Sequence, residues 1–212
     1  MSAKTPIEAA NVLLEGTAEL SSADKAKFAY FGVGAKILPP YRILNPGNIH
    51  IGDRTAVREG CHINAFRDLS FIHDYVEAAY KSDFRREDYL YDGKIFFDHT
   101  CQIGRFFFVS CTREIRVGDH VVFSERVFVG DNNHGFAHAE VPIMQQTNKP
   151  GAPVRIGRGS WIGVGAALLA GARLGRNTVV GANAVVKGGD YPDHAVIAAP
   201  AAEVVFRRHG DD

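Results

Sequence analysis

The run Asp131-Asn132-Asn133-His134 holds the residues of this chain that are best suited to acid–base chemistry. His134 is the candidate general base, because a neutral imidazole takes up a proton near physiological pH and can activate a hydroxyl, whose own pKa lies far higher. Asp131 or Glu140 could orient the ring through its second nitrogen, and the sequence does not choose between them. No serine or cysteine stands in a nucleophile motif, so we expect direct attack rather than a covalent intermediate.

His138, four residues after His134, raises the alternative of a metal site. No further histidine occurs before His194, so a set of three nearby histidines is lacking. The three cysteines have no metal-ligand spacing and are expected to be reduced core residues; they are Cys61, Cys101 and Cys111. We therefore expect no metal.

The elements that must position these residues follow from a repeat. An aliphatic residue recurs at every sixth position, at Ile156, Ile162, Leu168, Leu174, Val180 and Val186. A second series at 117–129 follows the same rule, and fainter copies occur at 51–63 and 103–109. A period of six differs from the 3.6 of a helix and is typical of a parallel β-helix, in which three hexads form one triangular coil. We expect the aliphatic residue to point inward, and the following glycine to be there for its backbone freedom at a sharp turn.

The chain divides into three parts on this pattern. Residues 1–41 are predicted to form an N-terminal arm, helical over 5–30, with an extended segment that leads into the first coil. Residues 42–190 form the β-helix, interrupted by an insert at 65–93 and a loop at 131–153. Residues 191–212 form a closing segment and tail. Two extra residues between Val109 and Val117 shift the repeat, which predicts a bulged corner.

Composition excludes several classes of protein. The 212 residues carry 24 Lys and Arg against 24 Asp and Glu, so net charge indicates no basic surface for nucleic acid. The first residues lack the pattern of a signal peptide, and no apolar run approaches the length of a transmembrane helix. We expect a cytoplasmic protein.

Two stretches of the chain resemble a known family. VGDHVVFSERVFVGDNNHGF at 117–136, followed by VRIGRGSWIGVGAALLAGARLGRNTVVGANAVVKGG at 154–189, is similar to the hexapeptide-repeat acyltransferases. The likeness covers about 115–206 and is nearest to galactoside and maltose O-acetyltransferases and to enzymes that act on surface polysaccharides. It implies left-handed coils, a homotrimer with active sites between subunits, acetyl-CoA as co-substrate and a sugar or glycan hydroxyl as acceptor.

The resemblance also implies roles for single residues. His134 would be the base, and the backbone N–H of Val164 would stabilise the oxyanion. The other positions expected to bind the coenzyme are Trp161, Gly163, Ala182, Lys187 and Arg208. Those expected on the acceptor side are Asp131, Asn133 and Ser110. The insert is rich in tyrosine and arginine, which suits sugar rings, or else it packs on the β-helix or on a neighbouring subunit.

Two alternatives remain open. A nucleotide-sugar N-acetyltransferase would transfer the acetyl group to an amine, which depends less on a base because a deprotonated amine is already nucleophilic. A non-catalytic β-helix scaffold would keep the fold without the chemistry, although the presence of both His134 and Trp161 argues against it.

Overall fold

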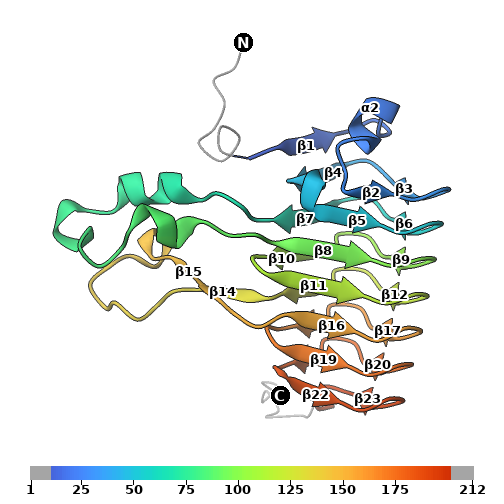
Figure 1. Cartoon of the computed structure of the whole chain (residues 1–212). Helices are drawn as coiled ribbons and strands as arrows, with labels where there is room; N and C mark the ends of the chain where they lie inside the picture. The colour runs from blue at the N-terminus through green and yellow to red at the C-terminus, as the bar shows by residue number, and fades with distance from the viewer. Residues whose placement is uncertain (1–10, 202–212) are drawn as a thin grey trace, which may run out of the picture.

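The computed structural model describes residues 11–201, which pass in turn through three seven-stranded sheets (Figure 1). Sheet A contains β1 (Leu13–Gly16), β4 (Tyr41–Leu44), β7 (Cys61–Ala65), β10 (Phe108–Cys111), β13 (Phe128–Gly130), β18 (Ala167–Leu168) and β21 (Val185–Val186). Sheet B contains β2 (Tyr30–Phe31), β5 (Ile49–Ile51), β8 (Lys94–Phe97), β11 (Glu114–Val117), β16 (Val154–Ile156), β19 (Ala172–Leu174) and β22 (Gly189–Tyr191). Sheet C contains β3 (Lys36–Ile37), β6 (Ala56–Val57), β9 (Gln102–Ile103), β12 (Val122–Phe123), β17 (Trp161–Ile162), β20 (Val179–Val180) and β23 (Val196–Ile197).

Neighbouring strands in these sheets run parallel, except that β1 is antiparallel to β4. The register follows the sequence repeat: Ile156 lies opposite Leu174, and Ile162 opposite Val180, each 18 residues further on. The prediction of an all-β, parallel-strand protein is confirmed, and the three stacked sheets are consistent with a hexapeptide-repeat β-helix. No helix in the described part of the chain is long and apolar enough to cross a membrane.

The aliphatic residue of each hexad points inward, as the repeat predicts. Ile162, Leu168 and Val180 are completely buried in one continuous core. The three cysteines are free and buried in the same core. Burial raises the pKa of Cys61 to about 12 and that of Cys101 to about 11, which keeps both thiols protonated and unreactive at neutral pH.

Glycine follows the inward aliphatic residue for a different physical reason from the one predicted. Gly157 and Gly163 are not in the left-handed region of backbone conformation. Instead, a Cβ at Gly157 would lie 2.3 Å from the carbonyl oxygen of Gly175 in the next coil. Close stacking of the coils, rather than backbone freedom, therefore requires glycine there.

The prediction of a helical arm over residues 5–30 is wrong for most of the residues in this range that the structure describes. Leu13–Gly16 form β1, and only Ser22–Lys25 form a helix, α2, which the side chain of Ser21 caps. Pairing with β4 satisfies an otherwise open sheet edge, so tertiary hydrogen bonding outweighs the helical pattern. Residues 5–10 lie outside the described part.

The boundaries of the β-helix also shift outward. The first parallel strand, β2, begins at Tyr30 rather than near residue 42, so residues predicted to belong to the arm already form strands of sheets B and C. At the other end, β23 adds a strand to sheet C beyond residue 190. The predicted closing segment therefore begins inside the stack.

The two interruptions leave the stack at the same corner, between sheets A and B, and form one lobe at the left of Figure 1. The insert lies between β7 and β8 and contains the 3-10 helices η2 (Ser70–Tyr75), η3 (Ala78–Tyr80) and η4 (Arg86–Tyr89). The loop lies between β13 and β16 and contains β14 (Asn132–His134), η5 (Ile143–Gln145) and β15 (Asn148–Pro150). The 3-10 helix η1 (Pro46–Asn48) turns the same corner one coil before the insert. The lobe has its own small core of Leu69, Val76, Phe84, Tyr89 and Val141.

Candidate active site

His134 is the last residue of β14, at the root of the lobe, and its side chain is exposed. β14 pairs with β15 as an antiparallel ribbon in which His134 lies opposite Asn148. Because side chains alternate along a strand, His134 is on the same face of the ribbon as Asn132. The Asn132 amide donates to the carbonyl oxygen of Ser110 at 2.9 Å, so this face is turned toward the end of β10 in sheet A.

The residues predicted beside His134 are divided by this ribbon. Ser110 is half-buried and holds Asn132, so it anchors the strand that carries the candidate base. Asn133 is exposed on the opposite face of β14 from His134. An acceptor placed against His134 therefore has Ser110 on its side of the ribbon and Asn133 on the other.

Asp131 has a structural role instead of the predicted contact with substrate. It is completely buried. Its oxygens accept hydrogen bonds from the backbone N–H groups of Thr112 and Arg113, both at 2.8 Å. No described residue donates to or accepts from the His134 ring, so neither Asp131 nor Glu140 orients it within residues 11–201.

His138 packs inside the lobe rather than joining His134 in a site. Its ring lies edge-on to Phe84, with 4.9 Å between centroids. Its backbone N–H donates to the side chain of Gln146. Among residues 11–201 no group of three or more histidine, cysteine or acidic side chains could hold a metal ion.

The tyrosines of the insert serve mainly the lobe itself. Tyr89 is completely buried, and its hydroxyl donates to the carbonyl oxygen of Gln145 at 2.8 Å. Tyr91 is half-buried, and burial raises its pKa to about 12. Tyr75 alone of the insert's four tyrosines is exposed. Most of the tyrosines predicted to bind sugars therefore pack within the lobe, and few aromatic side chains of the insert are exposed to a ligand.

The predicted coenzyme residues gather at sheet C and the corner between sheets C and A. Trp161 is 52% exposed on the outer face of sheet C, and its indole Nε1 donates to the hydroxyl of Ser124 at 3.1 Å. Val164 turns the adjoining corner, and Ala182 lies 18 residues further on, at the same corner of the next coil. The structure thus brings Trp161, Gly163, Val164 and Ala182 into one region.

Val164 has a backbone donor that is free for a ligand. The N–H of Gly163 donates to Val180 O at 2.7 Å, whereas the N–H of Val164 has no acceptor in residues 11–201. An unpaired N–H at a turn is the kind of group that can stabilise an oxyanion. Lys187 is exposed after β21, and Arg208 lies outside the described residues.

His134 and the coenzyme residues are not together within one chain. His134 leaves the corner between sheets A and B, whereas Val164 is at the corner between sheets C and A. The width of sheet A separates them. A single chain therefore presents the candidate base and the candidate oxyanion donor at opposite edges of one face.

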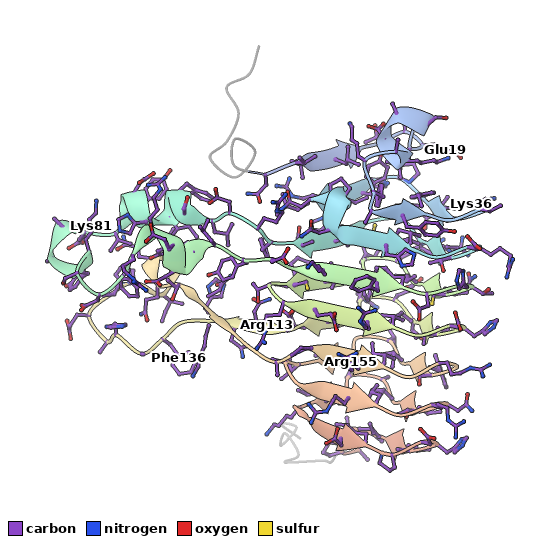
Figure 2. The ribbon with its side chains drawn as sticks, in the orientation of Figure 1. Glu19, Lys36, Lys81, Arg113, Phe136 and Arg155 are labelled. Carbon is purple, nitrogen blue, oxygen red and sulfur yellow. The ribbon has the colours of Figure 1, made fainter. Side chains whose placement is uncertain are left out.

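The outer faces of the sheets differ in polarity, a feature that the sequence reasoning missed. Sheets A and C and their shared corner expose apolar side chains, namely Phe106, Phe108, Val122, Trp161, Val164, Val185 and Val196. Phe108 and Phe128 stack on sheet A with centroids 5.8 Å apart. Sheet B carries ion pairs on its outer face, such as Arg173 with Asp190 and Arg155 with Glu114. The corner between sheets C and A carries both kinds of group, because Arg105 pairs there with Glu59 and Glu125. Figure 2 shows Arg155 on sheet B and Phe136 out on the lobe. The signal was available for most of these residues, because five of them directly precede an inward position of the repeat, namely Phe108, Val122, Trp161, Val185 and Val196.

Comparisons with known proteins agree with this architecture. Residues 153–188 match the family described as bacterial transferase hexapeptide (six repeats). A Mycobacterium tuberculosis protein named a probable acetyltransferase, Rv3034c, is 30% identical over 172 residues, which are 79% of this chain and 54% of that protein. The Escherichia coli protein WbbJ, named for O-acetyl transfer in lipopolysaccharide biosynthesis, is 27% identical over 78% of this chain and 75% of its own length. Residues 153–188 therefore carry hexapeptide repeats like those of bacterial transferases.

A solved structure shares the fold. AntD, an N-acyltransferase from Bacillus cereus in complex with dTDP and 3-hydroxybutyryl-CoA, superposes with a TM-score of 0.62 over 88% of this chain and 87% of that chain, at 19% identity. This likeness concerns the fold alone. The chain spans about half the length of the mycobacterial relative.

Proposed function

We propose that the chain is an acyltransferase that moves an acetyl group from acetyl-CoA to a hydroxyl of a sugar or glycan, with His134 as general base. The observation that carries this proposal is the exposed His134 imidazole at the root of the lobe, with no partner in the described residues that would occupy it. The free N–H of Val164 supports it, because acyl transfer needs a donor for the oxyanion. The names of the two relatives point to the same reaction class.

The residues would act in sequence. His134 removes the proton from the acceptor hydroxyl as its oxygen attacks the thioester carbonyl. Val164 donates its N–H to the oxyanion of the tetrahedral intermediate. When the carbon–sulfur bond breaks, the leaving thiolate takes the proton from the His134 imidazolium, so the base returns to its neutral form. Trp161, Gly163 and Ala182 would line the coenzyme site, and Lys187 and Arg208 would meet its phosphates.

The proposed site is completed by a second copy of the chain. Because His134 and Val164 lie at opposite edges of sheet A, the base of one chain would face the corner of its neighbour. The exposed apolar side chains on sheets A and C support a homotrimer packed through these faces, while the ion pairs of sheet B favour contact with water.

An amine acceptor on a nucleotide sugar is the second candidate. The observation that favours it is the lack of an orienting group for His134 within residues 11–201, because an amine depends less on a well-positioned base. AntD, which shares the fold, was crystallised with dTDP.

The deciding experiment follows CoA release by the purified full-length protein. Acetyl-CoA is offered with panels of neutral sugars, glycans and amino-sugar nucleotides, for both the unchanged protein and His134→Ala. The proposal expects release with a hydroxyl acceptor that His134→Ala abolishes. Release with an amine that survives His134→Ala would establish the alternative. No release with any acceptor, together with no acetyl-CoA binding by calorimetry, would indicate a scaffold.

A further inference from the structure

The corner between β10 and β11 is held by one buried carboxylate. The two extra residues in the repeat place Thr112 and Arg113 at this corner, and their N–H groups donate to a side chain rather than to a neighbouring strand. Asp131, from the following coil, accepts from both, from Thr112 to Oδ1 and from Arg113 to Oδ2, each at 2.8 Å. It also accepts from the hydroxyl of Thr112 at 3.2 Å and from the thiol of Cys111 at 3.3 Å.

Aspartates also accept backbone N–H groups from the preceding coil at the corner between sheets B and C, but with fewer hydrogen bonds. There Asp53 accepts the N–H of Val33, Asp119 accepts that of His99, and Asp193 accepts that of Arg176. Each of these aspartates takes a single backbone N–H from the preceding coil and remains partly exposed. Asp131 takes two and is completely buried, so removing it would leave the buried N–H of Thr112 and the part-buried N–H of Arg113 without their acceptor.

Asp131 is also the point where the chain leaves sheet A to form β14. Its Oδ1 accepts from the amide of Asn132 at 3.1 Å, and the same amide donates to the carbonyl oxygen and the hydroxyl of Ser110. The first two residues after β13 are thereby fixed to the preceding coil. His134 is two residues further along this strand.

We propose that Asp131 is a positioning residue for His134. Through Thr112, Arg113 and Asn132 it sets the direction in which β14 leaves the stack, and so the place of the imidazole. Asp131 touches neither substrate nor the reacting atoms. This role rests on the proposed function of His134, but the placement of β14 can be measured without any activity.

The test compares Asp131→Asn with Asp119→Asn. Both replace a carboxylate that accepts a backbone N–H from the preceding coil, but Asp119 is at the corner away from the lobe. Hydrogen–deuterium exchange of the full-length protein should rise at 112–113 and 131–135 in Asp131→Asn only. The kcat should fall about 10²-fold, the usual cost of displacing a catalytic group by roughly 1 Å, while the KM for acetyl-CoA stays within about twofold. Asp119→Asn should keep the kcat of the unchanged protein.

Several outcomes would overturn the proposal. Unchanged exchange at 131–135 in Asp131→Asn would do so whether or not His134 is the base. So would an unchanged kcat in Asp131→Asn if His134→Ala is inactive. If His134→Ala is active, the proposed function fails, and the positioning of β14 is then judged by exchange alone. If Asp131→Asn does not fold, Thr112→Val takes its place, because it removes only the hydroxyl that donates to Asp131. Thr112→Val should then raise hydrogen–deuterium exchange at 131–135. Unchanged exchange there would contradict the positioning role of Asp131.

Discussion

The unpaired imidazole of His134 makes a sharp prediction about single residues. His134→Ala should lower kcat about 10²–10⁴-fold, the usual contribution of a general base. Acetyl-CoA affinity should stay nearly unchanged, because Trp161 and Val164 are at another corner of the chain. Steady-state kinetics and calorimetry measure the two quantities.

His138→Ala is the matched control for this variant. It removes a second histidine from the same loop, one whose ring packs on Phe84 in the lobe. It should keep turnover within a few-fold of the unchanged protein. Equal losses in both variants would show that the loop, rather than the imidazole of His134, accounts for the effect.

Trp161 permits a similar comparison on the coenzyme side. Trp161→Phe keeps an aromatic ring but removes the hydrogen bond to Ser124, and Ser124→Ala removes the same bond while keeping the indole. If the exposed indole packs on the coenzyme, Trp161→Phe should raise the KM for acetyl-CoA several-fold with little change in kcat. Ser124→Ala should have a smaller effect in the same direction. An unchanged KM in Trp161→Phe would remove Trp161 from the coenzyme site.

The buried thiols predict a loss of stability at alkaline pH. Burial raises the pKa of Cys61 from 9.0 to about 12 and that of Cys101 to about 11. The folded state therefore holds these protons more tightly than the unfolded state, so the stabilisation is complete below pH 9 and is lost as pH rises toward 11–12. At one pH unit above the unfolded value each thiol should contribute about 1.4 kcal/mol to this loss.

Denaturant unfolding at pH 7 and pH 10 measures the effect. The double variant Cys61→Ala, Cys101→Ala should show a smaller decrease in unfolding free energy between these pH values than the unchanged protein. An equal decrease in both proteins would assign the alkaline sensitivity to other groups, such as Tyr91, whose pKa burial also raises.

The sequence predicts the positions of residues that have a fixed place in the hexad repeat. It does not predict side-chain contacts between one coil and another. His134 and Trp161 were predicted from the resemblance to the acyltransferases, in which each has a fixed offset from an aliphatic position of the repeat, and their roles stay predictions. Asp131 was misjudged because its partners, Thr112 and Arg113, come from an irregular corner of another coil. Asn133 was placed beside His134 because the ribbon of β14 and β15, which puts them on opposite faces, left no pattern in the sequence.

Among the elements, the lobe is the part whose removal is most informative. The ends of the insert lie side by side, because the N–H of Leu69 donates to Tyr89 O and that of Tyr91 donates to Arg67 O. Residues 70–88 can therefore be replaced by an Asn-Gly turn between Leu69 and Tyr89. The shortened protein should bind acetyl-CoA with unchanged affinity but lose transfer to its natural acceptor, because the lobe that carries His134 loses Val76 and Phe84 from its core.

Tyr89→Phe provides the mild counterpart of this deletion. It removes only the hydrogen bond to Gln145 O and leaves the ring in the lobe core. It should reduce transfer far less than the deletion does. A deletion variant that is unfolded or monomeric would show instead that the insert supports the stack or the assembly, and the acceptor site would then have to be sought elsewhere.

Element prediction succeeded for the hexads and failed at the N-terminus for a physical reason. Each hexad carries its own signal, an inward aliphatic residue, and repeats it regularly, so strand and register follow from spacing alone. Leu14 and Leu20 are also buried, but Leu14 belongs to β1 and Leu20 to the irregular segment before α2, so they do not share one helix face. What decided their structure was the open edge of β4, which no local pattern around residues 11–20 reveals.

For the whole molecule, the uneven polarity of the three outer faces predicts assembly. Light scattering at micromolar concentration should show a homotrimer. Phe106→Glu replaces an apolar residue that is 59% exposed at the corner between sheets C and A with a charged one, and should shift the protein toward monomers with loss of activity. Arg155→Ala on sheet B should leave the trimer intact. A monomer in the unchanged protein would contradict the proposed site between subunits.

The joining of the insert and the loop into one lobe has a consequence for biosynthesis. A ribosome releases residues 65–93 well before residues 131–153, and coils can stack in the meantime because each needs only the coil before it. Phe84 and Tyr89 must stay uncovered until Val141 and Gln145 have emerged. The strand that bears His134 therefore reaches its final place only after roughly half of the stack already exists, and the nascent chain carries an exposed aromatic segment through that interval, which is a ready target for chaperones.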